Sequence, residues 1–135
     1  MTDDVRWQQR FQNFTKALGQ FDAAMALQQE RELTPLEKQG VIQCFEYSYE
    51  LGWQSLRDYL QWQRTTDLVG SRDTIREAYA RGLIRDGDGW MAMLAARNRT
   101  SHTYNLATAN AILESIRDAF HGLFLDLAVE LEQRL

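Results

Sequence analysis

The sequence predicts an all-α protein, and two observations carry this prediction. One proline and eight glycines occur in 135 residues, too few for the many turns that an all-β chain of this length needs. Apolar residues also recur at spacings of three and four, which is typical of amphipathic helices. We therefore expect a single domain over residues 1–135, built as an antiparallel four-helix bundle with one short additional helix.

The first helix is predicted from about Asp3 to Glu30 by an apolar stripe on one face. The stripe consists of Phe11, Phe14, Leu18, Phe21 and Met25. A start signal for the second helix follows: Thr34 can cap it, Pro35 fits its first position, and Glu37 can close a capping box.

The second helix should reach about Gln63 and carries apolar residues on more than one side. Its spine consists of Val41, Phe45, Tyr49, Gly52, Leu56, Tyr59 and Leu60, with further aromatic residues at Tyr47, Trp53 and Trp62. Such a helix is expected at the centre of a bundle or at a subunit interface.

A short third helix is predicted after Gly70, with Ser71 as its cap, Asp73 near its positive end and Gly82 as its stop. The segment Asp86-Gly-Asp-Gly is interpreted as a helix-capping turn.

A further helical stretch should begin at Trp90 and reach about Asn98. Thr108 is the expected cap of the last long helix. That helix should carry Ile112, Ile116, Ala119, Leu123 and Leu127 on one face.

Composition favours a soluble protein of the cytoplasm. Cys44 is the single cysteine, so no disulfide can form within one chain, which favours a reducing compartment. The chain opens with the acidic Met1-Thr-Asp-Asp and no apolar segment follows, so we expect no secretory signal. No window approaches the roughly 18 uninterrupted apolar residues of a membrane helix, so we expect no membrane association.

Metal and cofactor chemistry find no support in the sequence. His102 and His121 are far apart and give no zinc-like cluster with the lone cysteine. Glu46 and Glu50 have helical spacing, but no Glu-x-x-His motif accompanies them as a di-iron site would require. The Asp86 turn lacks the spaced ligands of a calcium loop, and no glycine-rich phosphate loop is present. We expect neither a metal nor a cofactor.

A local basic site is predicted in this acidic chain, whose net charge is −4. The segment Gly89–Leu113 contains no Asp or Glu, and within it lies the run Arg97-Asn-Arg-Thr-Ser-His-Thr-Tyr-Asn105. This run offers what metal-independent cleavage of RNA needs. His102 can act as a base on a 2′-hydroxyl, and Arg97 can stabilise charge that develops at phosphorus. The alternative is that these residues only cap helix ends.

Two further groups of residues leave alternatives open. Glu46 and Glu50 lie on one helical face and could orient Arg97 or Arg57 through charge-assisted hydrogen bonds, or could be solvated. The aromatic residues of the second helix could form a base-stacking platform, although a core or dimer-interface role is favoured at this spacing. This aromatic group consists of Tyr49, Trp53, Tyr59 and Trp62.

Arg97, His102 and Tyr104 resemble the Arg-x(4–6)-His signature of HEPN domains, in the tyrosine-containing form of the HepT toxins. The surrounding chain, from about Gln43 to Asn105, is similar to the nucleotidyltransferase substrate-binding proteins. The matching segments are Phe45–Leu60, Ser71–Ala78, Gly82–Ile84, Trp90–Leu94 and Arg97–Tyr104.

This resemblance implies a homodimeric HEPN-like toxin encoded with a minimal nucleotidyltransferase, of the MNT type, as its antitoxin. Its activity would be metal-independent RNA cleavage by Arg97 and His102, supported by Asn98, in a composite site of two subunits. The nucleotidyltransferase would neutralise it by transferring AMP to Tyr104. The alternative is a noncatalytic subunit that binds substrate or nucleotide for a nucleotidyltransferase.

Two departures from the family pattern concern this site. Position 99 is Arg where many relatives have an apolar residue, and we expect Arg99 to point outward. Asn105-Leu-Ala107 stands where relatives often have acidic residues, and we expect this difference to alter how a partner docks.

Overall fold

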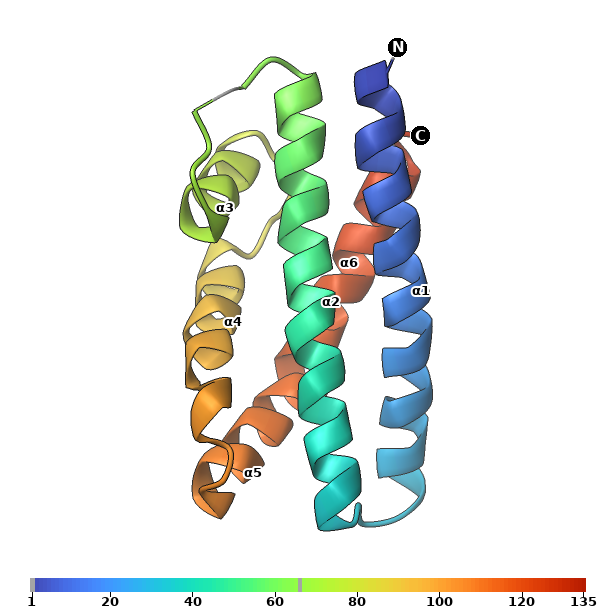
Figure 1. The fold of residues 1–135 in the computed structure, drawn as a ribbon, viewed down its shortest axis with the longest axis vertical. Coiled ribbons are helices and arrows are strands. Elements are labelled where there is room, and N and C mark those ends of the chain that lie inside the picture. Colours follow the sequence, from blue (N-terminus) through green and yellow to red (C-terminus); the bar gives the residue numbers. More distant parts are fainter. Residues whose placement is uncertain (1, 66) are drawn as a thin grey trace.

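The computed structural model describes residues 2–65 and 67–135, and within them it is all-helical. The elements are α1 (Thr2–Glu30), α2 (Pro35–Trp62), α3 (Ser71–Ala80), α4 (Gly87–Arg99), η1 (Thr100–His102), α5 (Leu106–Ser115), η2 (Ile116–Phe120) and α6 (His121–Glu132). Figure 1 shows α1 and α2 side by side, α3 and α4 on the opposite side of α2, and α5 to α6 as one continuous rod that crosses obliquely. The predicted helical bundle with a short additional helix, α3, is confirmed.

The central place of α2 is also confirmed, because it contacts α1, α3, α4, α5 and α6. All seven predicted spine residues of α2 are buried, and so is the whole predicted stripe of α1. At Gly52 the chain leaves room for its neighbours: a Cβ there would lie 3.2 Å from Phe14, 3.5 Å from Trp90 and 3.6 Å from Leu127. Four helices therefore meet at this glycine. The prediction missed Trp7, which is fully buried in the first turns of α1.

The capping box before α2 is confirmed. The Glu37 amide donates to Thr34 Oγ1 at 3.2 Å, and the Thr34 amide donates to Glu37 Oε1 at 2.8 Å. Arg31, at the end of α1, adds hydrogen bonds to both carboxylate oxygens of Glu37, at 2.8 and 2.6 Å. The Arg31 guanidinium and the Thr34 amide lower the pKa of Glu37 to about 2. The α1–α2 corner is thus fixed by charge-assisted hydrogen bonds.

The start of α3 corrects the prediction, and the start of α4 refines it. Gly70, not Ser71, is the N-cap of α3 and makes no side-chain capping bond. The stop at Gly82 is confirmed, because its φ is 74°, in the left-handed region that favours glycine. Asp86 caps α4 by accepting from the Gly89 amide at 2.8 Å, which confirms the capping turn. Helix α4 therefore begins at Gly87, before the predicted Trp90.

The last helix corrects the prediction at two points. Asn105 caps α5 by accepting from the amides of Ala107 and Thr108, at 2.9 and 3.2 Å, so Thr108 lies inside the helix. The five residues of η2 form a π-helical turn, which carries one more residue per hydrogen-bonded ring than an α-helix. This shift turns Phe120 into the core and leaves Ala119 exposed, contrary to the α-helical prediction.

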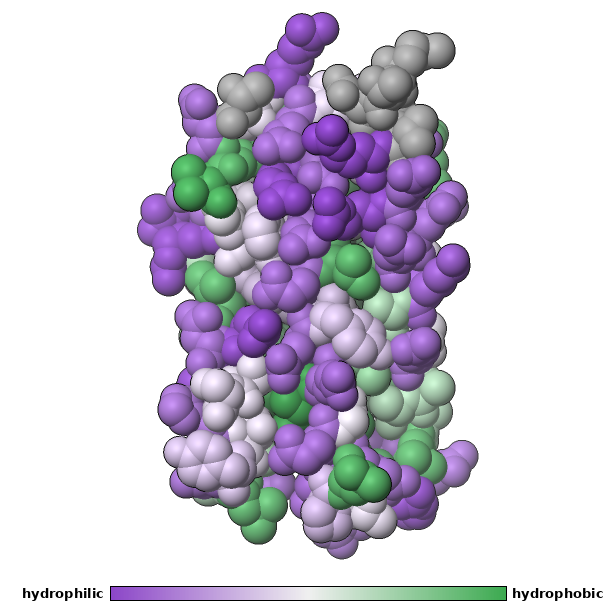
Figure 2. Space-filling view, viewed as in Figure 1, coloured by the Kyte–Doolittle hydropathy of each residue, from purple (hydrophilic) through white to green (hydrophobic). Residues whose placement is uncertain are grey.

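The face of the bundle in Figure 2 is mostly hydrophilic, with apolar residues scattered over it in small groups. Among the described residues, no helix is both long and apolar enough to cross a membrane.

Candidate functional site

The Arg97 segment lies where α4 ends and the chain turns into α5. Arg97 occupies the last turn of α4, His102 ends the short η1 turn, and Asn105 opens α5. The start of α2 holds the turn in place: Gln39 Nε2 donates to the Thr103 carbonyl at 3.2 Å, and Thr103 Oγ1 donates to Gln39 Oε1 at 3.3 Å. The hydrogen bonds of Gln39 therefore hold this segment against the start of α2.

The guanidinium of Arg97 is held from two directions. From α2, Glu50 Oε1 accepts from Nε at 3.2 Å and Glu46 Oε2 lies 3.5 Å from Nη1. From its own segment, Thr100 Oγ1 accepts from Nη1 at 3.1 Å and donates to the Arg97 carbonyl at 2.7 Å. Of the two sequence alternatives for Glu46 and Glu50, the structure thus places both carboxylates at Arg97.

These contacts leave one edge of Arg97 available. In the part of the chain that the structure describes, no residue accepts a hydrogen bond from Nη2. The side chains of Arg97, Glu46 and Glu50 are each about one third exposed, at 34, 33 and 36%. Partly exposed ion pairs contribute little to stability, so the network matters chiefly because it fixes the direction of a cation that still reaches solvent.

His102 and Tyr104 lie on the surface, in the segment that connects α4 to α5. Both side chains are exposed, Tyr104 to 84%. Their rings pack edge to face with centroids 6.0 Å apart. Neither side chain has a hydrogen bond to any described residue, so contacts within the chain orient Arg97 but not the imidazole or the phenol.

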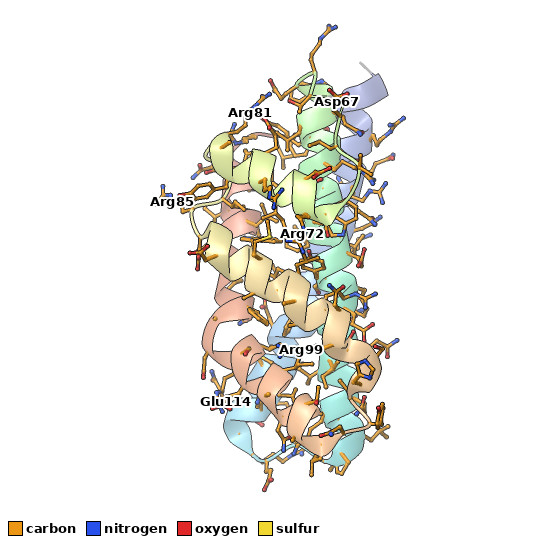
Figure 3. All side chains as sticks on the ribbon, turned by 90° about the vertical axis from the view of Figure 1, so that its left-hand side faces the viewer. Asp67, Arg72, Arg81, Arg85, Arg99 and Glu114 are labelled. Atoms are coloured by element: carbon orange, nitrogen blue, oxygen red, sulfur yellow. The ribbon has the colours of Figure 1, made fainter. Side chains whose placement is uncertain are left out.

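The structure does not bring the other predicted residues into the network. Asn98 and Arg99 are both exposed on α4, and neither side chain has a hydrogen bond to a described residue. Figure 3 shows Arg72, Arg81, Arg85 and Arg99 on the side formed by α3 and α4; Arg81 pairs with Glu77. The outward placement expected for Arg99 is therefore confirmed.

The aromatic residues of α2 belong mainly to the core. Tyr49, Trp53 and Tyr59 are at most 9% exposed, which excludes the base-stacking platform in this conformation. Burial raises the pKa of Tyr49 to about 12, so its phenol stays protonated at neutral pH. Sequence reasoning missed Trp53 Nε1, which donates to Glu50 Oε2 at 3.0 Å. It also missed the Thr100 hydroxyl, although its spacing of three from Arg97 is a usable signal.

In residues 2–65 and 67–135, no group of three or more His, Cys, Asp or Glu side chains is gathered as a metal ion would require. The segment offers an oriented guanidinium at Arg97 and, five residues further along the chain, an exposed imidazole at His102.

The fold and the site together define a class: a small helical bundle that presents an Arg-x(4)-His segment at one edge, with the Arg held by glutamates from the central helix. The chain matches, over residues 9–133, the family described as nucleotidyltransferase substrate binding protein like. It belongs to this family.

Known relatives agree with this assignment. A curated protein of Haemophilus influenzae, named "Probable ribonuclease HepT", is 41% identical over 83 residues, which are 58% of this chain and 57% of that protein. A solved Haemophilus influenzae structure, described as the fold of a substrate binding domain of a nucleotidyltransferase, is 29% identical with a TM-score of 0.82, covering 91% of this chain and 99% of that one. A solved structure from Thermus thermophilus is 29% identical with a TM-score of 0.78, covering 87% of this chain and 98% of that one.

Proposed function

We propose that this protein is a metal-independent endoribonuclease toxin whose site is formed by Arg97 and His102. The observation that carries the proposal is the Arg97 guanidinium, which Glu50, Glu46 and Thr100 hold on two of its nitrogens while Nη2 is left to bind a phosphate oxygen. The relative named as a probable ribonuclease supports the same activity.

The reaction uses the 2′-hydroxyl of RNA as the nucleophile. Neutral His102 takes the proton of this hydroxyl, and the oxygen attacks the adjacent phosphorus. Arg97 stabilises the negative charge that develops on the nonbridging oxygens. The bond from phosphorus to the 5′ oxygen breaks, leaving a 2′,3′-cyclic phosphate, and the 5′ oxygen takes a proton from an imidazolium. A homodimer would supply that second imidazole from its other copy of His102.

Control of the activity is proposed to occur at Tyr104. A nucleotidyltransferase partner transfers AMP from ATP to the phenol oxygen, with release of pyrophosphate. The 84% exposure of Tyr104 makes its hydroxyl accessible to another enzyme, and its ring lies against His102. The added nucleotide brings bulk and negative charge to the place where RNA phosphate must bind, so it blocks cleavage.

Cleavage of RNA in EDTA tests the activity. We expect His102→Ala and Arg97→Ala each to reduce the cleavage rate at least about a hundredfold, the range that removal of an acid-base or charge-stabilising group costs. His121→Ala is the matched control, because this second histidine pairs with Asp22 of α1, away from the Arg97 segment. Undiminished cleavage in both site variants would refute the proposal.

The modification is tested with the cognate nucleotidyltransferase, ATP and magnesium, followed by mass spectrometry. We expect an adduct of AMP on Tyr104, with loss of cleavage, and no adduct in Tyr104→Phe. Exposed Tyr79, at 57%, serves as the internal control. An adduct on another residue, or none, would remove Tyr104 from the mechanism.

A second function is favoured by the family description and by the solved relative described as a substrate binding domain of a nucleotidyltransferase. In that case the chain would be a noncatalytic subunit that binds substrate for its partner. The purified protein would then cut no RNA but would change the activity of the nucleotidyltransferase, and Arg97→Ala would weaken that effect.

A further inference from the structure

A continuous series of polar contacts runs along α2 and ends at Arg97. It begins at Asp58, which is only 4% exposed and accepts from Arg10 of α1 at 3.0 Å. Arg57 also donates to Asp58, from Nε and Nη2 at 3.3 Å. A buried carboxylate needs such partners, and here they fix the guanidinium of Arg57.

Trp53 connects this anchored arginine to the site. The Arg57 guanidinium carbon lies 5.1 Å from the centre of the Trp53 ring, a cation–π contact. Arg57 lies over the face of the ring, and at the edge of the ring the indole N–H donates to Glu50 Oε2 at 3.0 Å. The ring is 9% exposed and packs in the core, so the direction of its N–H is set by the fold.

Glu50 therefore accepts one N–H group at each of its carboxylate oxygens. Trp53 occupies Oε2, and Arg97 Nε occupies Oε1 at 3.2 Å. Glu46 differs, because among the described residues its only partner is Arg97, at 3.5 Å. Of the two carboxylates at Arg97, Glu50 is the one whose own orientation is fixed.

The chemistry of the indole suits this task. Its N–H is a neutral donor and cannot accept a proton, so it orients the carboxylate without competing with Arg97 for charge. A lysine or arginine in the same place would neutralise Glu50 and weaken its hold on the guanidinium. Trp53 thus adds orientation while it leaves the Glu50–Arg97 attraction intact.

We propose that Trp53 is a positioning residue for Arg97 and acts through Glu50. The inference rests on the proposed ribonuclease function, because it concerns the guanidinium that stabilises the reacting phosphate. Misplacing such a group by a fraction of an ångström lowers the rate of the chemical step more than it lowers binding.

The test compares Trp53→Phe, Glu50→Gln and the double variant of the full-length chain. Phe keeps the ring in the core and under Arg57 but removes the N–H. We expect Trp53→Phe to lower kcat about tenfold with KM changed less than about twofold, as the loss of an orienting partner does. The double variant should be no slower than Glu50→Gln alone, because Trp53 acts on Arg97 only through Glu50.

Trp62→Phe is the matched control, since Trp62 is also on α2 and in the aromatic cluster but has no hydrogen bond to a described residue. Its kcat should equal that of the unsubstituted protein. An unchanged kcat in Trp53→Phe, or losses in the double variant that multiply, would overturn the proposal. Urea unfolding of each variant establishes that it folds.

A second measurement needs no cleavage. Hydrogen exchange by NMR should show the Arg97 Nε–H exchanging with water at least severalfold faster in Trp53→Phe, and the Trp53 indole N–H faster in Glu50→Gln. If the protein cuts no RNA but exchange changes as expected, the ribonuclease function fails and the positioning contact stands. Unchanged exchange in both variants refutes the positioning role whatever the protein cleaves.

Discussion

Substitution of Gly52 by alanine tests how closely the helices that carry the site are packed. The new methyl group would lie 3.2 Å from Phe14, 3.5 Å from Trp90 and 3.6 Å from Leu127. The first distance is shorter than ordinary van der Waals contact between carbons, so a ring must move by a few tenths of an ångström. Trp90 lies in the first turn of α4, the helix whose last turn carries Arg97.

Two opposing effects set the magnitude. Replacing glycine by alanine inside a helix stabilises by about 0.8–1 kcal/mol, whereas overfilling a well-packed core costs about 1–3 kcal/mol. Gly52→Ala should therefore lower the free energy of unfolding by about 0–2 kcal/mol. Gly19→Ala provides the matched control, because Gly19 lies inside α1 and, apart from the backbone of its own helix, no atom lies within 4 Å of its would-be Cβ. It should stabilise by about 0.8–1 kcal/mol.

Urea unfolding followed by circular dichroism measures both variants, and their difference of about 1–3 kcal/mol isolates the packing cost. The slopes of the two transitions should agree, since neither change alters the surface exposed on unfolding. Equal stabilisation by the two substitutions would show that α1, α2, α4 and α6 do not meet tightly at Gly52.

Two more predictions concern the ends of helices. Because the guanidinium of Arg31 is the main cause of the low pKa of Glu37, about 2, Arg31→Ala should raise that pKa toward its ordinary value. The Glu37 contribution to stability is complete above the ordinary pKa of a glutamate and is lost as pH falls through about 2. In Arg31→Ala this loss should occur at higher pH. An NMR titration in which the Glu37 pKa is the same in both proteins would show that Arg31 does not lower it. Asn105→Ala removes the cap of α5 and should cost about 0.5–2 kcal/mol in urea unfolding, while Asn105→Asp should cost less; equal losses would mean that the side-chain cap does not matter.

The parts of the fold that could be predicted are those decided by local chemistry. Thr34 and Glu37 form their capping box within four residues, and Gly82 takes a left-handed conformation that few other residues adopt. Ser71 is a reasonable cap by residue type, but the backbone of Gly70 takes that position. Several residues near a helix start can cap it, and tertiary packing decides among them.

The π-helical turn could not be predicted from spacing. A period of 3.6 residues places Ala119 on the core face after Ile112 and Ile116, and it keeps this register only if the helix stays regular. The large Phe120 stacks on Phe45 of α2 with ring centroids 5.4 Å apart and an interplanar angle of 18°. The burial of an aromatic ring outweighs that of a methyl group, so the helix takes an extra residue per turn where this ring enters the core.

In the candidate site, too, local features could be predicted from the sequence, whereas contacts set by helix packing could not. Arg97, His102 and Tyr104 lie within eight residues, so their spacing is visible in the sequence. The spacing of Glu46 and Glu50 placed both on one face but allowed either Arg57 or Arg97 as their partner. Only the packing of α4 on α2 decides for Arg97, because Arg57 is taken by Asp58.

The carboxylates of α2 also change the local charge around Arg97, although the segment Gly89–Leu113 itself contains no acidic residue. Glu46 and Glu50 face one guanidinium, so the charge of this cluster is −1. The carboxylates orient Arg97, but they also cancel its attraction for RNA at a distance. If the proposed function holds, exposed cations such as Arg99, and those of a second copy in a homodimer, would supply the attraction for RNA. On the proposed mechanism, one AMP group on the exposed Tyr104 adds negative charge to surroundings with little positive charge in excess. On this proposal, we expect a single modification to weaken the binding of RNA phosphate.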